Sequence, residues 1–167
     1  VQYCVNLIRK YKPDVVLTHD FNGEYGHGNH KATAYAVDKA VLLAQDASYH
    51  PESAAEYGTW EAKKLYIHLY EENSITIDFN VPLSSFDGMS AYDVARQALL
   101  QVRSQLKYPW LVYVHDEELY SCADWGLRYT SVGLDVYKNS FFENIEKFEP
   151  EKIKRNIQRN GIKALEE

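Results

Sequence analysis

A short apolar strand that runs into a glycine- and histidine-rich loop limits what this chain can fold into. The run Val15-Val16-Leu17 follows Pro13-Asp14, which ends a short amphipathic segment. The loop from Thr18 to His30 then gathers three of the chain's six histidines, two carboxylates and three glycines. Apolar periodicity from about residue 29 to residue 47 predicts a helix behind the loop. The order strand, loop, helix is typical of an open α/β sheet, in which ligands bind beyond the carboxyl ends of the strands.

Two histidines of this loop have a spacing that suits a chemical site. His27 and His30 are three residues apart, which places two imidazoles on one face of a helical first turn. Neutral imidazole suits zinc, but a catalytic zinc usually takes three protein ligands and a water, so the pair supplies at most two. Asp20 and Glu24 are close in sequence and favour a metal or catalytic site. The alternative is a surface turn that caps a helix and carries its histidines by chance.

The same loop resembles a known family signature. Thr18-His19-Asp20 and Gly23-Glu24-Tyr25-Gly26-His27-Gly28-Asn29-His30 are similar to the second signature of the LmbE/PIG-L family of zinc-dependent N-acetylglucosaminyl deacetylases. The resemblance implies that His30 is a zinc ligand and that His27 is a catalytic group outside the ligand set. In the family's usual His-Pro-Asp-His pattern an Asp orients that catalytic histidine, and Asn29 takes its place here. Asn can accept a hydrogen bond from an imidazole but cannot stabilise an imidazolium by charge.

The family's first signature, close to Ala-His-Pro-Asp-Asp-Glu, does not occur in these residues. It would supply the other zinc ligands and a general base. We therefore expect residues 1–167 to be the carboxyl-terminal portion of a single LmbE/PIG-L-like domain, and we expect this portion alone to be catalytically inactive. Weaker resemblances to the family are Ser104-Gln105 and the segment from Ser140 to Ile145.

The resemblance implies a Rossmann-like, layered α/β/α fold with a mostly parallel sheet. The implied reaction removes the acetyl group from an N-acetylglucosamine-like sugar with Zn²⁺ as cofactor; a thiol-conjugated or lipid-linked amino sugar is a further option. His27 would stabilise the oxyanion or protonate the departing amine. From reach along the chain we add Tyr25 as a second donor to the same oxygen and Asp20 as a residue that binds sugar hydroxyls.

Composition excludes some partners and leaves one rival function open. The chain has 46% hydrophobic and 25% charged residues and a mean hydropathy of −0.46, which is typical of a globular protein. A net charge of −6 argues against nucleic acid, and no apolar run approaches the roughly 18 residues of a membrane span. A cytoplasmic location is the expectation. The rival is a catalytically inactive sugar-binding or structural relative, which Gly28, Asn29 and the missing signature would suit.

Elsewhere the pattern predicts ordinary elements. We expect Val15 to Thr18 to be a strand buried on both faces of a parallel sheet. Residues 48–60 are expected to be a loop, in which His50 is exposed to solvent. His68 is expected to be a structural residue whose polar groups are satisfied. Aromatic residues crowd between Tyr108 and Tyr137, where they can line a sugar site, although ordinary packing is the commoner reason. The pattern predicts a helix in 1–12 and strands in 64–70 and 74–81, the second with one face exposed to solvent. A helix is expected to begin at the capping box Ser90–Asp93 and to end at Pro109. A charged terminal helix is expected from Glu149.

Overall fold

The computed structural model describes residues 1–103 and 122–145. Several predictions therefore concern residues outside this described part: the Ser104-Gln105 pair, the aromatic residues Tyr108, Trp110, Tyr113 and Tyr120, and the tail from Glu149. Within the described part, no helix combines the length and apolar character that crossing a bilayer requires.

Within residues 1–103 and 122–145, four strands form one mixed sheet in the order β1-β2-β4-β3. β1 (Val15–Thr18) pairs in parallel with β2 (Lys64–His68). β4 (Asp124–Thr130) pairs antiparallel with β2 and with the short β3 (Ile75–Thr76). The α/β class is thus confirmed, but among the described residues the sheet is mixed and a mostly parallel sheet is not confirmed.

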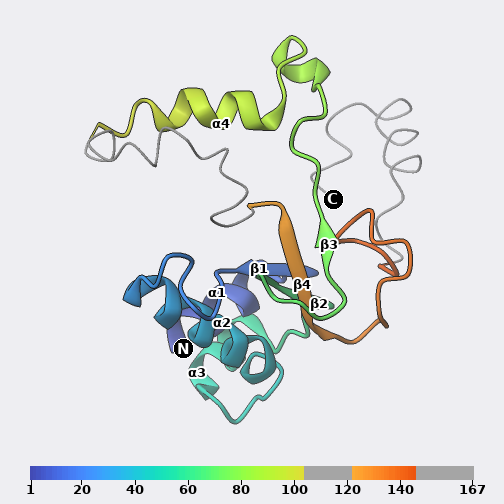
Figure 1. Cartoon of the computed structure of the whole chain (residues 1–167). Helices are drawn as coiled ribbons and strands as arrows, with labels where there is room; N and C mark the ends of the chain where they lie inside the picture. The colour runs from blue at the N-terminus through green and yellow to red at the C-terminus, as the bar shows by residue number, and fades with distance from the viewer. Residues whose placement is uncertain (104–121, 146–167) are drawn as a thin grey trace, which may run out of the picture.

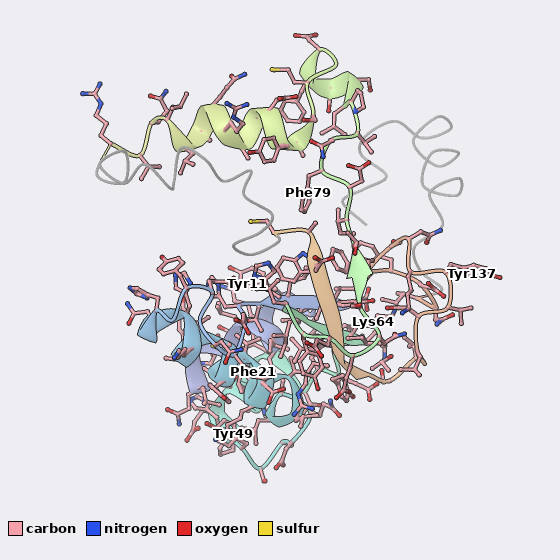
Figure 2. The ribbon with its side chains drawn as sticks, in the orientation of Figure 1. Tyr11, Phe21, Tyr49, Lys64, Phe79 and Tyr137 are labelled. Atoms are coloured by element: carbon pink, nitrogen blue, oxygen red, sulfur yellow. The ribbon has the colours of Figure 1, made fainter. Side chains whose placement is uncertain are left out.

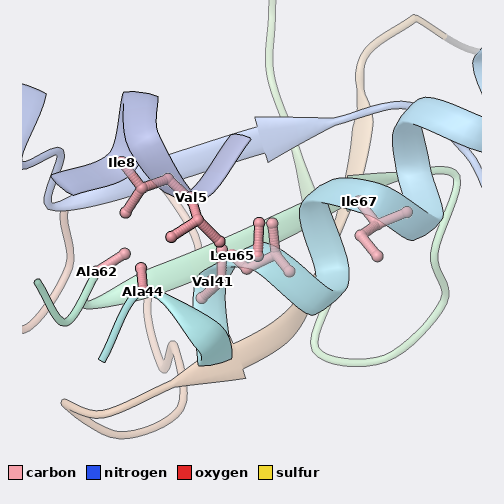
Figure 3. Close-up of a cluster of buried hydrophobic side chains, with 8 residues drawn as sticks. Val5, Ile8, Val41, Ala44, Ala62, Leu65 and Ile67 are labelled. Carbon is pink, nitrogen blue, oxygen red and sulfur yellow. The ribbon is translucent and has the colours of Figure 1, made fainter. Parts of the chain in front are cut away.

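Helices cover one face of this sheet (Figure 1). α1 (Gln2–Tyr11) and α2 (Gly28–Leu43) pack on β2, and α3 (Pro51–Tyr57) lies beside α1. Figure 3 shows the core between them, where small side chains from α2 let it approach the sheet closely. The buried members are Val5, Ile8, Ala40, Val41, Ala44, Ala62, Leu65 and Ile67.

The opposite face of the sheet is covered differently. Tyr66, Ile75 and Leu127 form a second buried cluster, and Phe141 from the segment after β4 packs on it. No second helical layer lies on this face within the described residues, so the expected α/β/α layering is only half seen there. α4 (Ala91–Leu99) and the 3₁₀ helix η1 (Ser84–Phe86) lie away from the sheet (Figure 1).

β1 is less buried than its sequence suggested. Leu17 is 43% exposed because β1 is an edge strand, with β2 as its neighbour on one side. Beside β1 runs an apolar groove of about 340 Å³, lined partly by Leu7, Val15 and Val37. The strand with all residues buried is β2, at the centre of the sheet. The prediction that β1 is buried on both faces was therefore wrong.

The segment 48–60, predicted to be a loop, contains α3. Its seven residues are too few to show a helical apolar period. Pro51 stands at the first helical position, and His50 caps the helix by accepting a hydrogen bond at Nδ1 from the Ser53 N–H at 3.3 Å. His50 is thus a capping residue and not simply a solvated one.

The later elements are shorter than predicted. Strand pairing in 74–81 is limited to Ile75 and Thr76, although burial still alternates from Ile75 to Asn80. The capping box of Ser90 and Asp93 is present as predicted, but α4 ends at Leu99. β4 was not predicted at all, because its sequence Asp-Trp-Gly-Leu-Arg-Tyr-Thr lacks a clean two-residue period.

Candidate metal and catalytic site

Three side chains from one loop converge at the carboxyl end of β1. His19 follows the strand, Glu24 lies in the loop, and His30 is in the first turn of α2. One potential ligand atom from each lies within 4.8 Å of the others. The loop folds back because Gly23 adopts a φ of +76°, where a Cβ would lie 2.5 Å from the His27 carbonyl oxygen. Gly23 is therefore required for the loop that brings the cluster together.

The carboxylate of Glu24 joins most of the polar contacts of this site. Oε1 lies 3.2 Å from His19 Nδ1 and accepts the backbone N–H of Asp20 at 3.2 Å, whereas Oε2 is bonded to His68 Nδ1. Burial would raise the pKa of Glu24, but the hydrogen bonds from His68 and Asp20, together with the charge of His68 and the bond to His19, lower it from 4.5 to about 2. Glu24 is consequently an anion at neutral pH.

His30 has the features of a neutral ligand. Its Nδ1 is buried and has no hydrogen-bond partner among the residues that the structure describes. Its ring stacks on that of His19 with 4.3 Å between centroids. Burial lowers the pKa of His30, and the charges of His19 and His27 lower it further against the opposing effect of Glu24. An unpartnered, neutral imidazole nitrogen beside a carboxylate is a donor that metal coordination would satisfy.

Two imidazoles and one carboxylate fit a divalent ion such as zinc. Metal ligands must be deprotonated to bind, and the low pKa of Glu24 and the lowered pKa of His30 both favour that state. Only His30 was predicted as a ligand from the sequence. The sequence did not mark His19 and Glu24 as candidate ligands, because a loop without regular spacing does not show which side chains meet, although both belong to the motif that was singled out.

The two predicted catalytic residues lie on the open side of the cluster. His27 is the exposed N-cap residue of α2, and its ring centroid is 4.9 Å from that of His30. Tyr25 is 56% exposed, with its ring centroid 5.4 Å from that of His30 and 6.0 Å from that of His27. Both side chains are therefore within reach of a molecule that approaches the cluster from solvent, and their catalytic roles stay predictions.

The other two predicted residues have local contacts. Asp20 is buried, and its Oδ1 accepts hydrogen bonds from the backbone N–H and the side-chain amide of Asn22 at 3.0 and 3.4 Å. Asn29 is exposed, and its carbonyl accepts a hydrogen bond from Thr33 Oγ1 at 2.9 Å. The Asp20 side chain thus has a structural function in the loop, whereas the Asn29 contact is made by its backbone. The predicted roles of Asp20 toward sugar and of Asn29 toward His27 stay predictions.

His68 was interpreted as a satisfied structural residue, and it is buried, but its partner is Glu24 of the cluster. The sheet topology explains this. Thr18 pairs with Ile67 in the parallel β1–β2 ladder. His19 and His68 are the next residues along the two strands, so both lie at the carboxyl ends of these strands. The signal in the sequence was a histidine at the end of a second buried strand.

Of the aromatic residues predicted to crowd near a sugar site, those described behave differently from one another. The Trp125 ring lies 4.9 Å from that of His68, between centroids. Tyr129 takes part in a hydrogen bond with Gln45 at 3.1 Å, away from the cluster. Tyr137 is 80% exposed, and Figure 2 shows it at the right-hand edge of the view, pointing outward. Trp125 is therefore the described member of this set that contacts the site.

Fold and site together define an α/β protein with a His-Glu-His cluster suited to a metal at the carboxyl end of a parallel strand pair. The family described as PIG-L, GlcNAc-PI de-N-acetylase, matches residues 2–41, which include all three cluster residues. The LmbE/PIG-L relationship that the motif predicted is thus confirmed, and the part of the chain that carries it is the N-terminal region.

Curated relatives named as deacetylases align with a part of the chain. A 1D-myo-inositol 2-acetamido-2-deoxy-alpha-D-glucopyranoside deacetylase from Geodermatophilus obscurus is 38% identical over 66 residues, which is 40% of this chain and 21% of the relative. A deacetylase of this kind from Catenulispora acidiphila is 34% identical over 64 residues, which is 38% of this chain and 19% of the relative. One from Segniliparus rotundus is 42% identical over 60 residues, which is 35% of this chain and 17% of the relative. The chain thus matches about a fifth of the length of these relatives. No solved structure matches the chain.

Proposed function

We propose that the protein to which this chain belongs is a metal-dependent hydrolase that removes the acetyl group from an N-acetylglucosamine-like sugar, with Zn²⁺ as its cofactor. The observation that carries the proposal is the convergence of His19, Glu24 and His30 inside the segment that matches a de-N-acetylase family. The names of the relatives, all deacetylases of an acetamido-glucopyranoside, support the substrate class.

In this proposal His30 holds the ion together with ligands from the family's first signature, which does not occur in residues 1–167, and His19 and Glu24 are further candidate donors beside it. A bound zinc supplies a water of lowered pKa and polarises the amide carbonyl. Glu24 does not serve as the general base, because a base works best with a pKa near the operating pH and that of Glu24 is about 2. Residues 1–167 alone are therefore still expected to turn over no substrate.

The groups on the open side of the cluster act on the reacting amide. His27 and Tyr25 donate hydrogen bonds to the oxyanion, or His27 delivers a proton to the departing amine. The sixteen-residue helix α2 begins directly after His27. The partial positive charge at the N-terminus of this helix favours the negative charge that develops on the oxyanion. This arrangement separates metal binding, by His30, from proton transfer, by His27.

The test measures metal content after dialysis and amine release from N-acetylglucosaminyl inositol in the intact protein. We expect His30→Ala to lose the metal and all turnover. His27→Ala should keep the metal and lose turnover by roughly 10²–10⁴-fold. His50→Ala, a histidine in the α3 cap, is the matched control and should keep both.

Two results would contradict the proposal. Amine release from a protein that holds no metal would remove the metal from the mechanism. A protein that holds zinc and binds the sugar without releasing acetate from any N-acetylated amino sugar would favour the alternative of an inactive sugar-binding relative.

A further inference from the structure

The Glu24 carboxylate ties the glycine-rich loop to the ends of two strands. At the end of β1, His19 Nδ1 and the Asp20 N–H each lie 3.2 Å from Oε1, and His68, the last residue of β2, bonds to Oε2 through Nδ1. An ionised carboxylate can only accept hydrogen bonds, so both histidines donate to it. Three donors from two strand ends therefore converge on one side chain of the loop.

These hydrogen bonds occupy most of the capacity of Glu24 to bind anything else. Each carboxylate oxygen has about two lone pairs, and both of those on Oε1 are engaged by His19 and the Asp20 N–H. Oε2 is bonded to His68, which is 6% exposed and packs on Trp125 with 4.9 Å between ring centroids. The carboxylate thus bonds inward to the sheet, and its effect on the site passes through the backbone that carries it.

That backbone has an unfavourable conformation. Glu24 has a φ of +60°, in the left-handed region that a residue with a Cβ rarely adopts. Such a conformation persists only where the surroundings determine it, and the three bonds to the carboxylate supply contacts that do so. If these bonds were lost, Glu24 could relax to a negative φ, and the chain after it would leave in a different direction.

Tyr25 is the next residue along this chain. Its ring centroid lies 5.4 Å from that of His30 and 6.0 Å from that of His27. Because Tyr25 is 56% exposed, burial does not fix its side chain, and its direction depends on the backbone conformation of Glu24. A displacement of about 1 Å of a reacting or donating group can lower a rate roughly 10²-fold. The tie at Glu24 is therefore placed to control Tyr25.

We propose that Glu24 is a positioning residue and not a metal ligand: held by His68 and by the end of β1, it fixes the left-handed backbone that directs Tyr25 at the reacting amide. The proposal rests on the proposed function, in which Tyr25 donates a hydrogen bond to the oxyanion. It adds that His68, which lies outside the residues 2–41 matched by the family, controls this donor from the central strand.

The experiment measures kcat, KM and metal content of the intact protein with N-acetylglucosaminyl inositol. Glu24→Ala removes all three bonds, and we expect kcat to fall by roughly 10²-fold while KM and metal content stay close to those of the wild type. Glu24→Gln keeps an acceptor for the Asp20 N–H and can donate to His68, so it should recover much of the loss in kcat. Glu52→Gln, at an exposed position of α3, is the control and should match the wild type. Loss of the metal from Glu24→Ala would make Glu24 a ligand and overturn the proposal.

A double-variant cycle distinguishes positioning from a general structural role. Tyr25→Phe removes the hydroxyl, and Glu24→Ala should cost little further kcat in that background, because Glu24 acts through Tyr25. A loss of the same size in both backgrounds would overturn the proposal. His68→Phe weakens the same tie from β2 and replaces Glu24→Ala if circular dichroism shows that Glu24→Ala does not fold. A wild-type kcat in His68→Phe would also overturn the proposal.

The outcomes separate this inference from the proposed function. If the intact wild type releases no amine from any N-acetylated amino sugar, the proposed function is refuted, and the role of Glu24 with it. If the wild type releases amine and Glu24→Ala has the same kcat, the proposed function stands and the role of Glu24 is refuted.

Discussion

At the scale of the residue, Glu24 combines an unfavourable backbone with a favourable charge. Its φ of +60° costs free energy, whereas its carboxylate accepts bonds from two histidines and a backbone N–H. Burial would raise the pKa of Glu24, but these hydrogen bonds and the charge of His68 outweigh that effect and lower the pKa to about 2. The balance therefore depends on pH.

The first prediction follows from that pKa. A carboxyl whose folded pKa lies below its ordinary value of 4.5 stabilises the fold above pH 4.5, and this contribution is lost as the pH falls toward 2. In metal-free protein we expect Glu24→Gln to unfold at lower denaturant than wild type at pH 6, with the difference shrinking between pH 4.5 and the lowest pH at which both fold. Urea unfolding at several pH values measures it. A difference that stays constant over this range would show that Glu24 contributes through packing and not through its charge.

At the scale of the element, one arginine links α1 to the connection between α2 and α3. Arg9 is fully buried, and its guanidinium donates hydrogen bonds at 2.7 to 3.3 Å to backbone carbonyls of that connection. The accepting carbonyls are those of Leu43, Ala44, Asp46, Tyr49 and His50. Each of these carbonyls except that of Tyr49 also accepts a hydrogen bond from a backbone N–H, so the guanidinium adds a second donor to most of them. Arg9 thus joins α1 to the connection through several hydrogen bonds from one buried side chain.

The second prediction concerns this arginine. Arg9→Lys keeps the charge but has three donors in place of five and no planar fork, so several of the hydrogen bonds between α1 and the connection are lost. We expect it to lower the free energy of unfolding by about 2–4 kcal/mol. Arg128→Lys is the matched control. Its ion pair with Asp38 at 3.0 Å is partly exposed, so the change should cost less than about 1 kcal/mol. Equal losses in the two variants would show that the buried carbonyls do not need Arg9.

The third prediction concerns Gly126 on β4, where the strand passes under the Tyr70 backbone. A Cβ at residue 126 would lie 2.0 Å from the Tyr70 carbonyl oxygen, and backbone atoms cannot move aside as a flexible side chain can. We expect Gly126→Ala to destabilise the fold by more than about 2 kcal/mol. Gly28→Ala is the control, since a Cβ there meets nothing within 4 Å and the residue begins α2. Thermal unfolding of both variants tests this, and a Gly126→Ala protein as stable as Gly28→Ala would contradict it.

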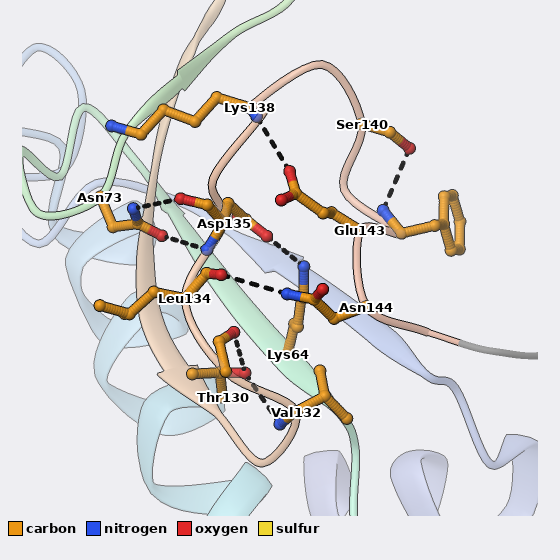
Figure 4. A network of polar contacts seen from close by, with 12 residues as sticks. Lys64, Asn73, Thr130, Val132, Leu134, Asp135, Lys138, Ser140, Glu143 and Asn144 are labelled. Atoms are coloured by element: carbon orange, nitrogen blue, oxygen red, sulfur yellow. Dashed lines mark hydrogen bonds and ion pairs between the residues drawn. The ribbon is translucent and has the colours of Figure 1, made fainter.

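At the scale of the whole molecule, a buried polar network fixes the segment after β4 to the central strand (Figure 4). Asp135 accepts hydrogen bonds from Lys64 Nζ and Tyr66 OH, all three on the face opposite the helices. Asn73 exchanges two hydrogen bonds with the backbone of Asp135, at 2.9 and 3.0 Å. Burial and the bond to Asp135 raise the pKa of Tyr66, so its phenol stays a donor. Within the described part of the chain, this network replaces a second helical layer.

The fourth prediction follows from the charge of Lys64. Asp135→Asn leaves a buried ammonium without its counter-charge, so we expect a loss of about 3–5 kcal/mol. Lys64→Met combined with Asp135→Leu removes both charges and should be less destabilising than Asp135→Asn alone. Chemical denaturation of the single and double variants measures the comparison. A double variant at least as destabilised as the single one would show that the ion pair itself, and not the avoidance of an unpaired charge, stabilises the fold.

The sequence by itself determined the features that depend on neighbouring residues. Three such features are the strand, loop and helix between Val15 and Leu43, the ring contact of His27 with His30, and the capping box at Ser90. Each forms between positions that are close in the chain. Local spacing and side-chain chemistry are sufficient for such contacts. The family resemblance was also readable there, because its motif is continuous.

The tertiary structure alone decided which distant residues join the site and the core. His68 reaches Glu24 across 44 positions, Lys64 reaches Asp135 across 71, and Arg9 reaches the α2–α3 connection across as many as 41. Exposure of β1 and burial of β2 likewise follow from strand order and not from their own sequences. The physical reason is that parallel pairing brings the ends of strands far apart in sequence to one edge, and no local period encodes which strands pair.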